Sequence, residues 1–192
     1  MVIGLMGFKQ SGKSTAAKYL EERYGFVRIN FKTALVEEIK AKFPDLLKVL
    51  ACFYHPDISV DEVTPEMIDW LFEEKPAPMR ALMQNYGTEV RRGDNPDYWV
   101  NQWIASTMIN KGRWIVADDV RFFNEAKAVK DNGGMLLRIT RPDIQSGGGH
   151  TSETEAMHIQ EDRQIEALPG GHDALYKQLD EYVAYLTSQV PR

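Results

Sequence analysis

Residues 7–14 have the types and the spacing of a loop that binds polyphosphate. They read Gly-Phe-Lys-Gln-Ser-Gly-Lys-Ser and match the pattern Gly-x4-Gly-Lys-Ser/Thr. Glycines let backbone N–H groups approach a phosphate closely, Lys13 can bridge the β- and γ-phosphates, and Ser14 can coordinate Mg2+. We call these residues the P-loop and expect a nucleoside triphosphate there. The predicted contacts are Gly7, Lys9, Gln10, Ser11, Gly12, Lys13, Ser14 and Thr15.

An acidic pair, Asp118 and Asp119, follows an apolar segment and could supply a second ligand for the metal. With such a loop, Mg2+ usually has an acid at the end of a neighbouring buried strand as its second anchor. A turn or helix-cap aspartate is the alternative interpretation, because aspartate is favoured at turns. Counting residues does not decide which of the two would face the ion.

Arginines could hold the remaining charge of phosphorylated substrates. The chain has 23 basic and 28 acidic residues and a net charge of -5, so phosphate must be held locally. A guanidinium group grips phosphate oxygens two at a time. The candidates are Arg91, Arg92, Arg121, Arg138 and Arg141. A surface ion pair is the alternative for each, and positions at strand ends favour Arg121 and Arg141.

Other residues with chemical potential have simpler interpretations. Trp99 and Trp103 lie four residues apart on an expected helix, where core packing is more common than base stacking. The single cysteine, Cys52, excludes an intrachain disulfide and a thiolate zinc cluster, and it favours a reducing compartment. His150 and Ser152 are spaced like part of a nucleophilic site, but Ser152 is accounted for as a helix cap.

The elements around the P-loop are those that such a loop requires. Residues 2–6 form an apolar run typical of a buried parallel strand, and a run of helix formers from Ser14 stops at Gly25. Strand, glycine loop and helix therefore follow one another. This context favours a nucleotide-binding loop over a glycine turn beside a chance lysine.

The rest of the chain continues to alternate. Further strands are expected over residues 26–30, 113–117, 135–140 and 163–167, and helices over 32–42, 79–86, 95–111, 124–131 and 173–187. Residues 45–75 predict two short helices, the second capped by Thr64, and the helix at 79–86 should end at Gly87. Ser152 and Glu155 predict a capping box. The pattern predicts an α/β P-loop sandwich of three layers with a five-stranded, mostly parallel sheet.

Length and composition narrow the class. The 192 residues suit one domain, and 43% hydrophobic with 27% charged residues is typical of a soluble globular protein. The acidic balance argues against nucleic acid or an anionic membrane as partner, and the apolar opening segment is too short to span a bilayer. We expect a small-molecule substrate and a cytoplasmic location. A homodimer is compatible with the sequence.

Several further segments occur in a diagnostic order. Residues 82–92 read Leu-Met-Gln-Asn-Tyr-Gly-Thr-Glu-Val-Arg-Arg, residues 119–126 read Asp-Val-Arg-Phe-Phe-Asn-Glu-Ala, and residues 150–153 read His-Thr-Ser-Glu. Together with the P-loop, Trp99 and residues 133–142, they resemble the bacteriophage-type deoxynucleoside monophosphate kinases over most of the chain. Very many NTPases share the P-loop, whereas the three later motifs are more specific.

The resemblance implies a single kinase domain over residues 1–192 that transfers the γ-phosphoryl group of ATP to a deoxynucleoside or ribonucleoside monophosphate. Residues 45–111 would be the helical acceptor-binding region, and residues 141–152 would form a lid. A phage-encoded protein of this kind would act in the host cytoplasm. Residues 45–78 carry no match to the family, so the acceptor base stays open.

The resemblance also implies roles for individual residues. Lys13, Arg121 and Arg141 would be catalytic, and Ser14 with Asp119 would hold Mg2+. The acceptor would be contacted by Arg92, Trp99, Asp119, Arg121 and Glu153.

Two alternatives remain at this stage. The first is a P-loop kinase for another metabolite, of the dephospho-coenzyme A or phosphomevalonate type. The second is a nucleotide-dependent switch or binding module. A guanine switch needs an Asn-Lys-x-Asp element, but Asn110, Lys111 and Gly112 are followed by Arg113, which lacks the base-reading carboxylate.

Overall fold

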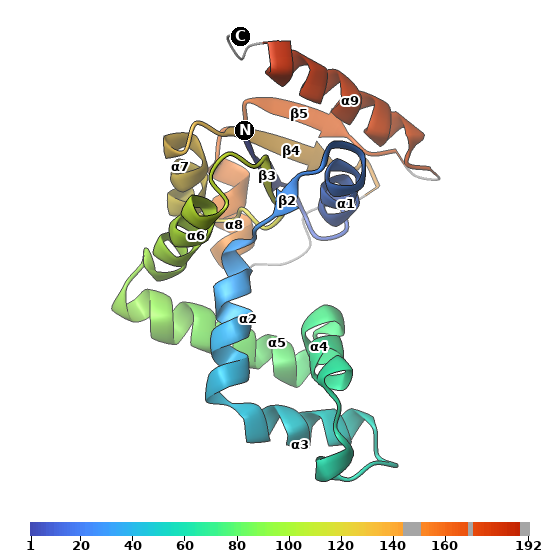
Figure 1. The fold of residues 1–192 in the computed structure, drawn as a ribbon, viewed down its shortest axis with the longest axis vertical. Coiled ribbons are helices and arrows are strands. Elements are labelled where there is room, and N and C mark those ends of the chain that lie inside the picture. The colour runs from blue at the N-terminus through green and yellow to red at the C-terminus, as the bar shows by residue number, and fades with distance from the viewer. Residues whose placement is uncertain (144–150, 169–170, 189–192) are drawn as a thin grey trace. The chain divides into compact units, whose positions relative to one another are not determined.

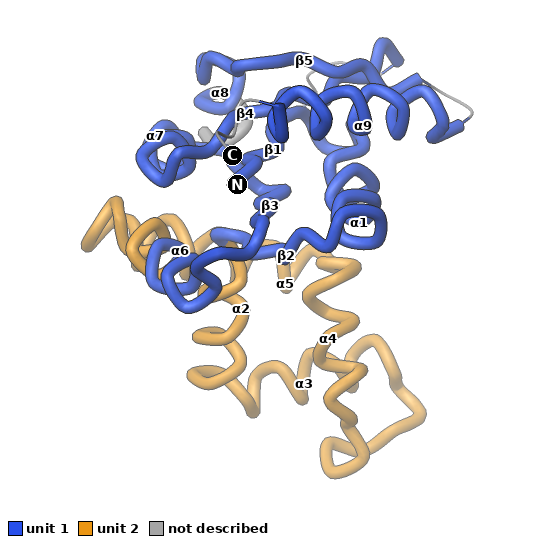
Figure 2. Tube along the Cα trace, turned by 45° about the horizontal axis from the view of Figure 1, so that its top comes forward, with its two compact units in different colours: residues 1–31, 103–192 blue, residues 32–102 orange. Residues whose placement is uncertain are grey.

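The computed structural model describes residues 1–143, 151–168 and 171–188, with residues 151–154 as backbone only. These residues form two compact units (Figure 2). Unit 1 comprises residues 1–31 and 103–192, and unit 2 comprises residues 32–102. Unit 2 is therefore inserted into the sequence of unit 1, and its bounds differ from the helical region expected over residues 45–111.

Unit 1 contains a parallel sheet, as the sequence predicts. Its strands are β1 (Val2–Met6), β2 (Val27–Arg28), β3 (Ile115–Ala117), β4 (Met135–Thr140) and β5 (Arg163–Glu166). Their order is β2-β3-β1-β4-β5, and each neighbouring pair is parallel. Parallel neighbours need crossover connections, which explains the alternation of strands and helices along the chain. The predicted fold class is confirmed, and β1 lies at the centre of the sheet.

Helices cover both faces of this sheet (Figure 1). The helices wholly within unit 1 are α1 (Lys13–Tyr24), α7 (Phe123–Asp131), α8 (Thr151–His158) and α9 (Asp173–Ser188). Ile3 and Leu5 of β1 belong to the core formed with α1 and α9. Gly4 faces the other side, where an added Cβ would meet Val129 of α7 at 3.1 Å. Because alternate strand residues point to opposite faces, this pattern defines three layers.

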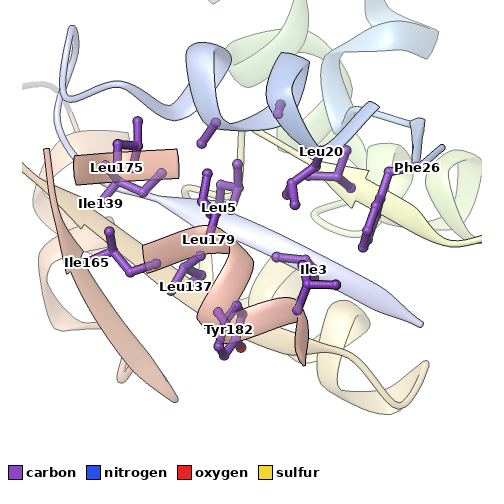
Figure 3. Close-up of a cluster of buried hydrophobic side chains, with 14 of the residues drawn as sticks. Ile3, Leu5, Leu20, Phe26, Leu137, Ile139, Ile165, Leu175, Leu179 and Tyr182 are labelled. Atoms are coloured by element: carbon purple, nitrogen blue, oxygen red, sulfur yellow. The ribbon is translucent and has the colours of Figure 1, made fainter. Parts of the chain in front are cut away.

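The core between the sheet and helices α1 and α9 holds the P-loop in place (Figure 3). Its labelled side chains come from β1, β4, β5, α1, α9 and the segment after α1: Ile3, Leu5, Leu20, Phe26, Leu137, Ile139, Ile165, Leu175, Leu179 and Tyr182. Burial of each such aliphatic side chain contributes about 1.5–3 kcal/mol. The strand before the P-loop and the helix after it are therefore fixed by the same core.

Unit 2 is helical and has a core of its own. Its elements are most of α2 (Phe31–Lys42), α3 (Pro44–Tyr54), η1 (Val60–Glu62), α4 (Pro65–Glu74), α5 (Ala77–Gln84), the π-helix η2 (Asn85–Arg92) and the start of α6 (Tyr98–Ile109). Thr64 caps α4 as predicted, since its side chain accepts from the Met67 N–H at 3.5 Å. Buried side chains that include Ile39, Leu71 and Met79 fill the interior.

The predicted helix end at Gly87 is wrong, because the chain continues from α5 into η2. Gly87 is buried, and an added Cβ would lie 3.0 Å from Leu35 Cδ2. The Gly87 carbonyl accepts a hydrogen bond from Trp99 Nε1 at 2.9 Å. The glycine therefore allows close packing in the middle of a helical stretch and does not terminate it.

The predicted capping box at Ser152 and Glu155 is also wrong. Helix α8 begins at Thr151, so Ser152 already lies within it. Glu155 Oε1 accepts instead from the backbone N–H of Phe123 at 2.6 Å, at the start of α7. A capping box is a local pattern, and here the carboxylate is used by a contact between distant segments.

Candidate functional site

The P-loop bends tightly between β1 and α1. Gly7 has φ +139°, Gln10 has φ +65° and Gly12 has φ +104°, all in the region that favours glycine. An added Cβ on Gly7 would lie 2.2 Å from the Ile139 carbonyl oxygen, which is backbone and cannot turn away. The first glycine therefore allows the loop to pass directly over β4.

Lys13 folds back over this loop. Its ammonium group donates to the carbonyl oxygens of Gly7 at 2.8 Å and Phe8 at 2.6 Å. Helix α1 begins at the same residue, has no side-chain cap at Gly12 and has no acid in its first turn. The partial positive charge of the helix N-terminus is thus not compensated by a carboxylate of this helix, which favours an anion at this point.

A buried hydroxyl in the P-loop provides a test of whether phosphate fits. Ser11 is 1% exposed, and among the described residues its Oγ has no hydrogen-bond partner. Most buried polar groups are paired, and an unpaired one calls for an explanation. The same Oγ would lie 2.7 Å from an added Cβ on Gly7, so the loop leaves room only for a glycine there. The loop shape and the unpaired hydroxyl both fit a bound polyphosphate.

A cavity of about 230 Å³ lies next to the P-loop. Its lining residues are Gln10, Gly12, Lys13, Ser14, Thr15, Arg141, Ala167, Leu168, Gly171, His172 and Leu175. One wall is the polar loop and the start of α1, and the other combines apolar side chains with an imidazole. Such a cavity can bind a planar, partly apolar group that is joined to phosphates.

The wall contributed by the end of β5 and the start of α9 was not predicted as a site. The sequence predicts only a strand over residues 163–167 and a helix over 173–187 in this region. Neither interpretation refers to residues 10–15, which are more than 150 positions earlier in the chain. Only the parallel pairing of β1, β4 and β5 brings these segments to one end of the sheet.

Arg141 reaches this cavity from the end of β4. Its guanidinium group makes two bonds to Asp143, Nε to Oδ1 at 3.0 Å and Nη2 to Oδ2 at 2.6 Å. The hydrogen bond from Arg141 lowers the pKa of the Asp143 carboxyl. Arg141 thus lies beside the P-loop with its charge held by a neighbouring acid. Residues 144–150 of the predicted lid lie outside the described residues.

The structure distinguishes the two acids after β3. Asp118 Oδ1 accepts from Asn30 Nδ2 at 2.7 Å, and Asp118 Oδ2 lies 3.6 Å from Arg28 Nη1. Both oxygens of Asp118 are therefore used to join β2 to β3. Asp119 Oδ1 accepts from the Phe31 N–H at 3.0 Å, at the start of α2. Both acids are therefore engaged by the protein, and Asp119 stays the metal ligand that the family resemblance implies.

No cluster of three or more His, Cys, Asp or Glu side chains suited to a metal occurs in the part of the chain that the structure describes. Magnesium held by one hydroxyl, one carboxylate and phosphate oxygens does not need such a cluster.

The arginines of unit 1 have different roles. Arg138 is engaged by the protein itself: Nε donates to Glu161 Oε2 at 2.8 Å, and the Nη atoms donate to the Ala156 and Ile159 carbonyls. This arginine holds the end of α8. Arg121 is exposed, and no described carboxylate pairs with its guanidinium group. Of these two, Arg121 is therefore the candidate for a ligand.

In unit 2, Arg91 is held inside a cluster of side chains. It pairs with Glu38 and donates through Nε to the Tyr86 hydroxyl at 3.1 Å. Its guanidinium group also lies over the rings of Tyr86 and Tyr98, 5.4 and 4.9 Å from their centroids. Arg92 donates to the Pro96 carbonyl at 3.4 Å. Arg91 is therefore an anchor of η2.

The two tryptophans considered as base-stacking candidates, Trp99 and Trp103, are buried. Trp99 is 3% exposed within the core of unit 2, and its N–H group is bound by Gly87. Trp103 is 2% exposed, donates to the Ile29 carbonyl at 2.8 Å and stacks on Phe31. This burial favours the packing interpretation for each. The side chain of Glu153 lies outside what the structure describes.

Comparison with known proteins gives one clear relative. A protein of Acanthamoeba polyphaga mimivirus, described as "Putative deoxynucleotide monophosphate kinase", is 36% identical over 171 residues, which cover 83% of each protein. No protein-family model matches the sequence.

A solved structure supports the fold. The crystal structure of TT1252 from Thermus thermophilus is similar with a TM-score of 0.50 and 17% sequence identity, and the match covers 97% of both chains. At this identity the likeness concerns the fold alone. Among the helices that the structure describes, none has the length and hydropathy needed to cross a membrane.

Proposed function

The chain belongs to the deoxynucleotide monophosphate kinase family, and we propose that it transfers the γ-phosphoryl group of ATP to a nucleoside monophosphate, giving the diphosphate. One observation carries this proposal: a bent P-loop, with Lys13 folded over it, opens beside a cavity that suits a base. The preferred acceptor is a deoxynucleotide, as the name of the viral relative suggests.

In this proposal the two walls of the cavity bind different parts of ATP. The P-loop amides and Lys13 hold the phosphates. Leu168 and Leu175 would contact the apolar faces of the base, and His172 can stack on it.

Magnesium would be held by Ser14 and Asp119. When bound, it would supply positive charge that neutralises the charge developing on the phosphate oxygens during transfer. Ser14 is exposed at the start of α1, and Asp119 follows the buried strand β3 next to β1. Asp119 is preferred over Asp118 because it is the acid of the Asp-x-Arg motif that the resemblance assigns to the metal.

The protein's own contribution to the chemistry is position and positive charge. Phosphoryl transfer requires the attacking and leaving oxygens to be in line and the migrating group to be surrounded by cations. Lys13 would exchange its bonds to the loop carbonyls for phosphate oxygens. Arg141 would likewise exchange Asp143 for phosphate. Arg121 is exposed and would bind the acceptor phosphate.

The acceptor side rests more on family resemblance. Arg92, Arg121, Asp119 and Glu153 are the proposed contacts. Trp99 is buried in the core of unit 2, which favours a packing role. The single cysteine suggests a reducing cytoplasm as the place of the reaction.

A coupled assay of ADP release tests the proposal. The full-length protein is given MgATP and, in turn, each deoxynucleoside and ribonucleoside monophosphate, dephospho-coenzyme A and phosphomevalonate. We expect release with nucleoside monophosphates, and most with deoxynucleotides. Activity on a non-nucleotide alone would reject the proposal in favour of another metabolite kinase. ATP turnover that needs no acceptor and is stimulated by a protein would favour a switch.

A further inference from the structure

A carboxylate ties α9 to α1 a short distance from the cavity. Asp180 Oδ1 accepts hydrogen bonds from two phenols of α1, Tyr19 at 2.7 Å and Tyr24 at 2.6 Å. Hydrogen bonds to an ionised acceptor are shorter and about twice as strong as those between neutral groups. Asp180 thus fixes two points of α1 against one point of α9.

Stacked rings continue from this carboxylate to the cavity wall. Tyr19 stacks on Tyr176 of α9 with ring centroids 4.0 Å apart and planes 5° apart. Tyr176 in turn contacts the imidazole of His172, with centroids 5.7 Å apart. His172 lines the cavity. We call Asp180, Tyr19, Tyr24 and Tyr176 the clamp.

Helical spacing links the clamp to the cavity on both helices. His172 directly precedes α9, and Tyr176 and Asp180 of this helix follow it by four and eight residues. The Tyr176 N–H donates to the His172 carbonyl at 2.9 Å. On α1, Tyr19 follows the cavity residue Thr15 by four residues. Residues four apart lie above one another on a helix. Tyr19, Tyr176 and Asp180 therefore lie one to two turns beyond the cavity walls on the same helix faces, and Tyr24 lies further along α1, at its last residue.

Apolar packing alone would not fix this geometry. Leu175, Leu179 and Tyr182 already bury α9 in the core, and the three tyrosines of the clamp pack against the same core. Hydrophobic contacts are non-directional, whereas hydrogen bonds have narrow distance and angle requirements. Two phenols on one oxygen therefore determine how far α9 lies along α1 and how it is rotated.

We propose that Asp180 is a positioning residue for the donor site: through Tyr19 and Tyr24 it fixes α9 against α1 and so holds His172 and Leu175 opposite Thr15, at the width that the base of ATP requires. This inference rests on the proposed function, because it takes the cavity as the place of the donor base. The clamp itself does not touch the nucleotide.

The test separates the base from the phosphates. A non-hydrolysable ATP analogue and inorganic tripolyphosphate are titrated by calorimetry into full-length wild type, Asp180→Ala, Asp180→Asn and Glu181→Ala. Loss of a charge-assisted bond should weaken binding of the analogue about tenfold in Asp180→Ala. Asp180→Asn, which keeps an accepting oxygen, should recover part of this loss. Tripolyphosphate, which contacts only the P-loop, should bind all four proteins equally.

Glu181→Ala is the matched control. Glu181 is the next residue of α9 and is exposed, and its replacement removes the same charge as Asp180→Ala does. This variant should therefore bind both compounds as wild type does. Unchanged binding of the analogue to Asp180→Ala would overturn the inference. An equal loss of affinity for the analogue and for tripolyphosphate would also overturn it. The second outcome would indicate general damage to the fold.

Two further variants keep the test decisive if Asp180→Ala does not fold. Tyr19→Phe and Tyr24→Phe each remove one hydrogen bond and keep the ring. Each should weaken binding of the analogue about threefold and leave binding of tripolyphosphate unchanged. Absence of any effect in both would contradict the inference. Wild type that binds the analogue no better than tripolyphosphate would also overturn it. Wild type that binds the analogue selectively but transfers no phosphoryl group would reject only the proposed function.

Discussion

Lys13 provides the most direct residue-level test of the P-loop. Its ammonium group is held at the loop by the Gly7 and Phe8 carbonyls, so it is already in place to meet phosphate oxygens. We expect Lys13→Ala to lower turnover roughly a hundredfold or more, as loss of a preorganised charge does at other sites. ADP release at saturating substrates measures this, with circular dichroism as the control for folding. A rate close to wild type in a folded variant would contradict the role.

The acidic pair after β3 gives a second prediction, in which neighbouring residues have opposite phenotypes. Asp119→Asn should raise the Mg2+ concentration needed for half-maximal rate roughly tenfold, since a neutral amide is a weaker ligand. Asp118→Asn should leave that concentration unchanged. It should lower stability by about 1–3 kcal/mol, because the pairing with Arg28 and Asn30 is disturbed. Magnesium titrations and urea unfolding measure the two effects, and the reverse pattern would exchange the assigned roles.

At the residue scale, the sequence predicts what is local. The P-loop and its flanking strand and helix are recognisable because their spacing is continuous in the chain. The choice between Asp118 and Asp119 is not local, because it depends on Asn30 and Arg28, which lie nearly ninety residues earlier. The same holds for His172, whose place in the cavity depends on strand pairing.

At the scale of elements, η2 shows how a sequence signal can be outweighed by packing. A glycine after an apolar run predicts a helix end. Here Gly87 instead lies against Leu35 of α2 and accepts from Trp99 of α6. Helical spacing of apolar residues nonetheless located most helices, and short apolar runs located the strands. Both patterns succeed because the apolar faces of these elements are buried. Turns of π-helix are rare and often occur at functional sites, and η2 carries the Gly-Thr-Glu motif.

The anchoring of η2 yields a third prediction. Glu38 accepts from the Tyr86 hydroxyl at 2.6 Å and the Tyr98 hydroxyl at 3.0 Å, and it also pairs with Arg91. Glu38→Ala should destabilise the protein by about 2 kcal/mol, because a half-buried arginine loses its partner. Urea unfolding measures this change.

The control lies on the same helix. Lys40 pairs with Asp69 at 2.5 Å, and both side chains are more exposed than those of the Glu38 pair. Lys40→Met should change stability by less than about 1 kcal/mol, as expected for a surface pair. Equal losses in Glu38→Ala and Lys40→Met would show that the Glu38 cluster is no stronger than an ordinary surface contact.

At the scale of the whole molecule, length and composition predict one domain, and this stays a prediction, because the two compact units with separate cores do not decide it. The length of 192 residues is compatible with either arrangement. The division depends on which distant segments pack together. Trp103 stacks on Phe31 and so belongs to unit 1, while Trp99, one turn earlier, packs in unit 2. Spacing along the helix cannot distinguish these two environments.

Stability of the whole protein should depend on pH through Asp180. The hydrogen bond from Tyr24, and then the one from Tyr19, lower the pKa of its carboxyl, and Arg23 adds to this. A group with a lowered folded-state pKa stabilises the fold above its unfolded pKa and loses that effect as pH falls through the folded value. The Tm difference between wild type and Asp180→Asn should therefore shrink as pH falls from about 5 to about 2, with most of the change below about 4. A difference that stays constant over this range would contradict the ionised clamp.

The proposed kinase activity is the transfer of one phosphoryl group between two nucleotides. ATP labelled in its γ-phosphoryl group is incubated with Mg2+, a deoxynucleoside monophosphate and either wild type or Lys13→Ala, and the products are separated. We predict that the label appears in the deoxynucleoside diphosphate with wild type and that its transfer is at least about a hundredfold slower with Lys13→Ala. Label released only as inorganic phosphate, at a rate indifferent to the monophosphate, would contradict the account.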